Sequence, residues 1–126
     1  MLKYVGAVEM VAQILYKSIL TSLELNGELI NNFVPKMARV VMGINYYPTC
    51  PDPSLTLGLS GHSDVGFLTI LHPSEVPGLQ IKYKGDWVSV FPVHESAFVV
   101  NIADQVEVCI CKIYLHHIGP CYFLVN

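Results

Sequence analysis

A succession of short strand-like segments, separated by turn signals, most constrains what this chain can fold into. The clearest lies at residues 78–90, G-L-Q-I-K-Y-K-G-D-W-V-S-V, where two alternating apolar runs predict a β-hairpin with its turn at Lys84, Gly85 and Asp86. Similar runs occupy residues 38–47, 55–59, 66–71 and 97–102, and the last is typical of a strand buried on both faces. Short strands with turns between them predict an antiparallel sandwich or jelly roll.

One helix precedes these strands. Residues 5–20 are rich in apolar side chains, but Glu9, Gln13 and Lys17 recur every four residues and form one polar stripe. The expected apolar side consists of Val8, Val11, Leu15 and Ile19. The segment therefore predicts an amphipathic helix and not a membrane span, so the fold class is mainly β with an N-terminal helix. No basic region followed by an uninterrupted apolar run opens the chain, and we expect a cytoplasmic protein without a signal peptide.

The composition is unusually apolar. The 126 residues are enough for one domain but short for two. The chain is 52% hydrophobic and 13% charged, whereas typical soluble domains are about 45–50% apolar and about 25% charged. This surplus indicates either a deeply buried core or a piece of a larger structure. Because the net charge is -3 and Arg39 is the only arginine, a nucleic-acid partner is disfavoured.

The four cysteines, Cys50, Cys109, Cys111 and Cys121, form no C-x-x-C pair. We interpret them as reduced thiols of a cytosolic protein. The alternative is a zinc module built on Cys109, Cys111, Cys121 and His117, although this spacing fits no standard zinc site.

Residues 57–71, L-G-L-S-G-H-S-D-V-G-F-L-T-I-L, interrupt an apolar strand pattern with His62 and Asp64. Because residues i and i+2 of a strand project from the same face, an imidazole and a carboxylate can meet there at one point. A second histidine from a later strand would complete the 2-His-1-carboxylate triad that holds iron(II) in non-haem oxygenases. In the alternative interpretation, Asp64 caps a turn and His62 makes a single hydrogen bond.

Five segments carry a wider resemblance. They are N-Y-Y-P-T-C-P-D-P-S-L-T-L-G-L-S-G-H-S-D (45–64), L-T-I-L (68–71), V-P-G-L-Q-I (76–81), W-V-S-V (87–90) and A-F-V-V-N-I-A-D-Q-V-E (97–107). In this order and spacing they resemble the plant 2-oxoglutarate- and iron(II)-dependent dioxygenases. The resemblance implies an incomplete double-stranded β-helix, the cupin-like jelly roll, with Fe(II) as metal and 2-oxoglutarate as cosubstrate.

The resemblance also assigns individual residues. His62 and Asp64 match the first two iron ligands, whereas Asn45 and Tyr47 match residues of the cosubstrate pocket. Asn101 and Asp104 match family positions as well. We interpret these two as structural residues that satisfy backbone partners near a strand end.

The resemblance ends after Glu107. Counted without gaps, the position of the family's distal histidine is occupied by Gly119, and His117 is the candidate third ligand because it keeps the same strand parity. The family's cosubstrate-binding arginine is not matched by Arg39. We therefore expect a single truncated domain over 1–126, with a helical lead-in at 1–34, a jelly-roll core at 38–107 and a divergent tail at 108–126.

The function that the resemblance implies is an oxidoreductase, a dioxygenase acting on a small organic metabolite in specialised or hormone metabolism. The alternative is a catalytically inactive dioxygenase-like fragment that binds metal weakly or not at all. Missing strands would leave open sheet edges, through which we expect self-association. We expect neither a nucleic-acid nor a membrane partner.

Overall fold

The computed structural model describes residues 1–24, 27, 40–94, 96–108 and 123–125. The chain divides into two compact units, Met1–Asn45 and Tyr46–Asn126. Each unit is described by itself below, and the expectation of a single domain over 1–126 stays a prediction.

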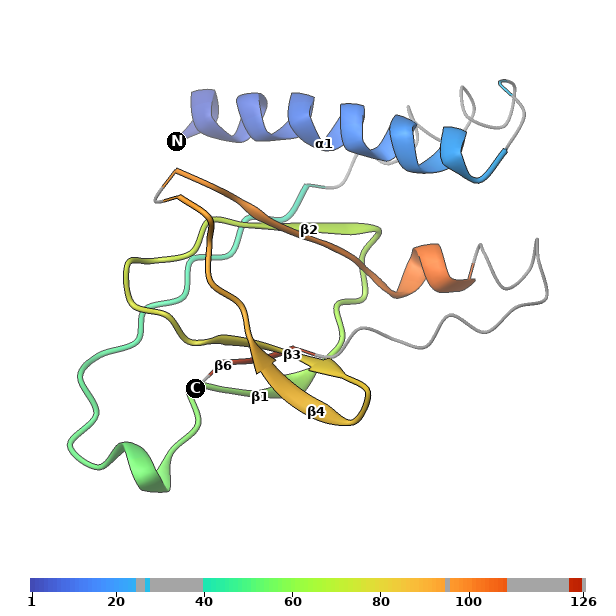
Figure 1. Ribbon diagram of the computed structural model, residues 1–126. Helices are drawn as coiled ribbons and strands as arrows, with labels where there is room; N and C mark the ends of the chain where they lie inside the picture. Colours follow the sequence, from blue (N-terminus) through green and yellow to red (C-terminus); the bar gives the residue numbers. More distant parts are fainter. Residues whose placement is uncertain (25–26, 28–39, 95, 109–122, 126) are drawn as a thin grey trace. The chain divides into compact units, whose positions relative to one another are not determined.

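The first unit contains the helix α1, Leu2–Ser22, which confirms the predicted helix and extends it at both ends (Figure 1). Its most buried side chains are Tyr16 and Leu20, which lie four residues apart on one face. Val11, expected on the apolar side, is exposed, so the buried face is rotated by about one residue from the prediction. No helix among the described residues is long and apolar enough to cross a membrane.

The predicted hairpin forms the strands β3, Leu79–Tyr83, and β4, Asp86–Ser89, of the second unit. The turn is shorter than expected, since Asp86 already pairs with Tyr83. Lys84 and Gly85 both have positive φ, 51° and 97°, as a two-residue type I′ turn requires. Such a turn matches the right-handed twist of the two strands and fixes their register.

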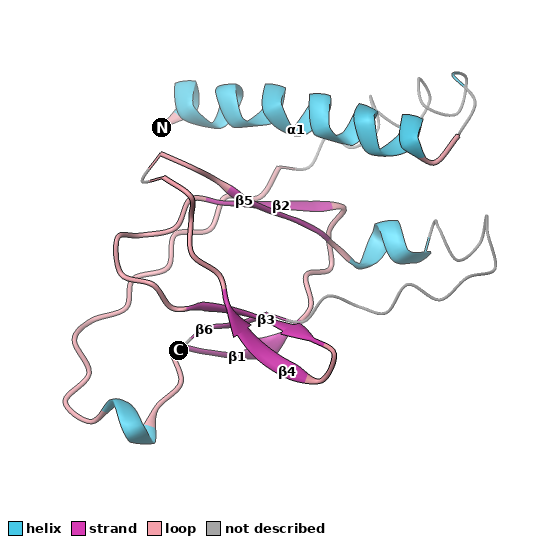
Figure 2. Ribbon diagram, viewed as in Figure 1, coloured by secondary structure: helices cyan, strands magenta, loops and turns pink. Residues whose placement is uncertain are grey.

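In the part of this unit that the structure describes, the strands form two antiparallel sheets (Figure 2). The larger sheet has the strand order β1-β6-β3-β4, in which β1 is Leu59–His62 and β6 is Phe123–Val125. The smaller sheet pairs β2, Leu68–Leu71, with β5, Val99–Ile102. Two antiparallel sheets after one helix agree with the predicted incomplete jelly roll.

Three strand predictions need correction. Within 38–47, the described residues 40–47 form no strand, because no described strand supplies the hydrogen bonds that a strand needs. The strand expected at 55–59 begins only at Leu59, because the 3₁₀ turn η2, Pro53–Leu55, precedes it. The strand expected to be buried on both faces alternates instead, with Val100 and Ile102 exposed.

The 3₁₀ turn has a local cause. The carboxylate of Asp52 accepts a hydrogen bond from the backbone N–H of Ser54 (3.2 Å), and Pro53 occupies the first position, where no backbone donor is needed. The polar cap and the fixed proline φ therefore outweigh the strand propensity of the following residues.

The best-buried apolar residues described in the second unit are Phe67, Ala103 and Val106. They lie where the linker 63–67, between β1 and β2, meets the residues that follow β5. Three backbone N–H groups donate across this junction: Ala103 to the Phe67 carbonyl (3.0 Å), Asp104 to Asp64 (2.9 Å) and Gln105 to Gly66 (3.1 Å). The core is therefore centred on the linker that carries Asp64.

Candidate metal centre

His62 is the last residue of β1, and Asp64 follows it in the linker 63–67. The expectation that one continuous strand carries both residues is therefore wrong for Asp64. The chain nevertheless brings the two side chains together, with 3.5 Å between His62 Nε2 and Asp64 Oδ1. Both side chains are partly accessible to solvent, at 38% for His62 and 25% for Asp64.

The His62 ring is oriented by its own strand. Its Nδ1 lies 2.9 Å from the carbonyl oxygen of Ser60. Because a carbonyl can only accept, Nδ1 carries the proton in this contact, and in the neutral ring the lone pair is then on Nε2. The nitrogen that faces Asp64 is thus the one that can bind a cation, an arrangement typical of metal-binding histidines.

The Asp64 side chain is held from the opposite sheet. Its Oδ2 accepts a hydrogen bond from Asn101 Nδ2 in β5 (3.0 Å), which leaves Oδ1 on the side of His62. The main chain at Asp64 is held as well, because its carbonyl accepts from the Asp104 N–H. A second side-chain contact joins the same elements, since Ser63 Oγ donates to Asp104 Oδ2 (3.0 Å).

These contacts correct the interpretation of Asn101 and Asp104. Both were expected to satisfy backbone partners, but their side chains bind Asp64 and Ser63. They therefore support the candidate site directly. The sequence contained one signal for this, a polar residue at position 101 inside an apolar strand, which is costly without a specific partner.

The donor atoms fit a divalent cation. Imidazole nitrogen and carboxylate oxygen bind such ions at about 2.0–2.2 Å, so one ion can reach both atoms across their 3.5 Å separation. An imidazole combined with a carboxylate suits iron(II) in the 2-His-1-carboxylate arrangement. Among the described residues, no group of three or more His, Cys, Asp or Glu side chains could hold a metal. His62 and Asp64 are therefore the candidates for two of the three expected ligands.

Two of the other predicted site residues belong to the described part of the chain. Asn45 and Tyr47 are exposed, and they belong to different units. His117 lies outside the described residues, as do Cys109, Cys111 and Cys121 of the alternative zinc module. The roles of all these residues stay predictions. Cys50 is an exposed free thiol.

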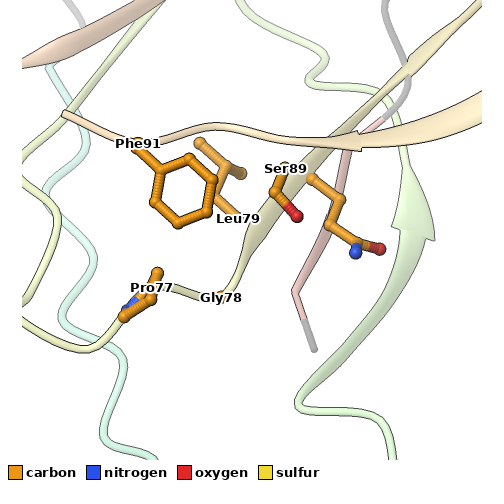
Figure 3. Close-up of a pocket in the computed structure, with 6 residues that line it drawn as sticks. Pro77, Gly78, Leu79, Ser89 and Phe91 are labelled. Atoms are coloured by element: carbon orange, nitrogen blue, oxygen red, sulfur yellow. The ribbon is translucent and has the colours of Figure 1, made fainter.

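A separate hollow of about 190 Å³ lies at the start of β3 (Figure 3). It is lined by Pro77, Gly78, Leu79, Gln80, Ser89 and Phe91. Figure 3 shows the Phe91 ring directed toward Pro77. Since neither His62 nor Asp64 lines it, this hollow is not the candidate metal centre.

The described strands form two antiparallel sheets, and a histidine and a carboxylate meet where β1 leaves the larger sheet. This arrangement is typical of cupin-like metal-binding proteins. The family model of the 2OG-Fe(II) oxygenase superfamily matches residues 38–119. The chain belongs to this family. The family bears out the predicted fold class, an incomplete double-stranded β-helix, and its use of iron(II) and 2-oxoglutarate bears out the predicted metal and cosubstrate.

Plant enzymes are among the relatives of this chain. The chain is 41% identical over 106 residues to protein DMR6-LIKE OXYGENASE 2 of Arabidopsis thaliana, a match that covers 84% of this chain and 30% of the relative. It is 54% identical over 70 residues to mugineic-acid 3-dioxygenase of Hordeum vulgare, covering 56% of this chain and 20% of that enzyme. The chain thus spans about a third or less of the length of these relatives.

Solved structures agree with this assignment. The crystal structure of JOX2 in complex with 2OG, Fe and JA has a TM-score of 0.75 and 31% identity, covering 98% of this chain and 36% of that chain. A putative oxygenase from Shewanella oneidensis has a TM-score of 0.63 over 99% of this chain and 47% of its own. At 20% identity, this second likeness shows the fold alone.

Proposed function

We propose that this chain carries the metal-binding part of an iron(II)- and 2-oxoglutarate-dependent oxygenase that oxidises a small organic metabolite. The observation that carries the proposal is the 3.5 Å approach of His62 Nε2 to Asp64 Oδ1. Nδ1 of His62 and Oδ2 of Asp64 are each hydrogen-bonded to another residue. The two atoms left for a metal, Nε2 and Oδ1, therefore face each other.

The chain's residues hold and orient the metal ligands. The Ser60 carbonyl keeps the proton on Nδ1 of His62, and Asn101 keeps Oδ2 of Asp64 turned away from the ring. When bound, iron(II) with 2-oxoglutarate supplies the oxidising chemistry, in which dioxygen is activated while the cosubstrate becomes succinate and carbon dioxide. His117 is the candidate third ligand, and Asn45 and Tyr47 are the candidate cosubstrate residues.

The substrate class follows from the family. The names of related enzymes specify small metabolites, among them mugineic acid and thebaine, and the JOX2 crystal structure holds JA. We accordingly propose a small molecule of specialised or hormone metabolism as substrate, and the cytoplasm as the location.

Formation of succinate from 2-oxoglutarate tests the proposal. The parent chain, assayed with dioxygen and a reductant, is expected to form succinate only when iron(II) is added. Asp64→Ala should abolish this turnover, because it removes one of two described ligand side chains. Asp86→Ala, which replaces an exposed aspartate at the start of β4, should leave it unchanged.

Turnover that survives Asp64→Ala would contradict the assignment of the metal site. A parent chain that binds iron(II) but forms no succinate would contradict the proposed activity and favour the alternative of an inactive dioxygenase-like fragment.

A further inference from the structure

Asn101 contacts the carboxylate of Asp64 across 37 residues of sequence. From this contact we infer that Asn101 is a positioning residue, which selects Oδ1 of Asp64 as the oxygen presented to the cation. The inference rests on the proposed metal site and adds a residue that acts through a ligand.

The geometry distinguishes the two carboxylate oxygens. Oδ2 accepts from Asn101 Nδ2 at 3.0 Å, whereas Oδ1 lies 3.5 Å from His62 Nε2. An aspartate without such a bond can rotate its carboxylate and offer either oxygen, or both at once. A donor fixed to Oδ2 removes this freedom before the metal arrives, so less conformational entropy is lost on binding.

Asn101 is itself well fixed. It lies within β5, where it pairs with Thr69 of β2 in a continuous register from Leu68↔Ile102 to Leu71↔Val99. The hydrogen bond to Asp64 is partly buried. A donor on a strand paired along its whole length holds its partner more accurately than one on a loop.

The main chain at Asp64 does not depend on Asn101. The Asp104 N–H donates to the Asp64 carbonyl at 2.9 Å, and Ser63 Oγ donates to Asp104 Oδ2 at 3.0 Å. Replacing Asn101 therefore releases the carboxylate while these contacts keep the linker 63–67 in place. A specific effect on metal affinity, separate from folding, is the expected consequence.

The test measures binding of Mn²⁺, a redox-stable probe, by electron paramagnetic resonance of the free ion with the full chain. Asn101→Leu keeps the number and branching of the side chain's heavy atoms but has no donor, and Asn101→Ala removes both. Each should weaken Mn²⁺ binding by about 10-fold or more, the usual effect of losing a partner that orients a ligand. The matched control is Thr69→Ala, which changes the residue paired with Asn101 and should alter affinity by less than about 2-fold.

Urea unfolding of the metal-free chains provides the second readout. A purely structural role of Asn101 predicts a lower unfolding midpoint for Asn101→Leu together with parental Mn²⁺ affinity, and that result would overturn the inference. The proposed function would survive it, since the parent would still bind the ion. A parent chain that binds no Mn²⁺ would overturn the inference and the proposed metal site together.

Discussion

Among the described residues, Val106 is the most deeply buried side chain. It is completely buried, at 0% exposure, and it follows the residues whose N–H groups hold the linker 63–67. Val106→Ala removes the equivalent of two methylene groups, or about 1.6 kcal/mol at about 0.8 kcal/mol for each buried group. The cavity left behind adds further destabilisation, so we expect a loss of about 2–3 kcal/mol in the free energy of unfolding.

The chain supplies a matched control in Val108, which belongs with Val106 to the described helical residues 104–108 and is 52% exposed. Val108→Ala makes the same chemical change and should alter stability by less than about 0.5 kcal/mol. Urea unfolding followed by fluorescence of Trp87, the single tryptophan, measures both variants. Equal effects of the two substitutions would refute the placement of the core beneath the linker.

Two further predictions concern the hairpin. Gly85 has a φ of +97°, so Gly85→Ala should destabilise the chain by about 1 kcal/mol in the same unfolding assay. Gly43→Ala, at a glycine that has open space and no such φ, should cost less, and an equal cost would contradict the turn geometry. The strand β4 pairs only with β3 among the described residues, and its Val88 is exposed. If the chain self-associates through this edge, Val88→Lys should lower the mean mass in sedimentation equilibrium, whereas an unchanged mass would exclude this edge.

Local patterns predicted the hairpin and the helix well. At 78–90 the alternation and the turn residues act within a few positions of each other, so sequence alone specified β3 and β4. The four-residue spacing of polar side chains likewise predicted α1, although its most buried residues are Tyr16 and Leu20 and not Val11. Burial depends on what covers a helix, which its own periodicity indicates only roughly.

Contacts between distant segments were not predictable in this way. The spacing of His62 and Asp64 indicated a shared site, and the two side chains do meet. The strand argument behind that expectation was wrong, however, because Asp64 lies in a linker and is positioned by Asn101, 37 residues away. Likewise, the strand propensity of residues 55–59 did not reveal that Asp52 and Pro53 would begin a 3₁₀ turn that includes Leu55. In both places a specific side-chain contact outweighs an average preference.

The most direct test of the account is an anaerobic iron(II) titration of the full chain, with and without 2-oxoglutarate. The visible charge-transfer band of iron-bound cosubstrate is the observable, and His62→Ala is the matched variant. We predict that the band forms in the parent chain and is lost in His62→Ala. A band that persists unchanged in the variant, or a parent chain that forms none at millimolar cosubstrate, would contradict the central claim that His62 and Asp64 together hold the metal.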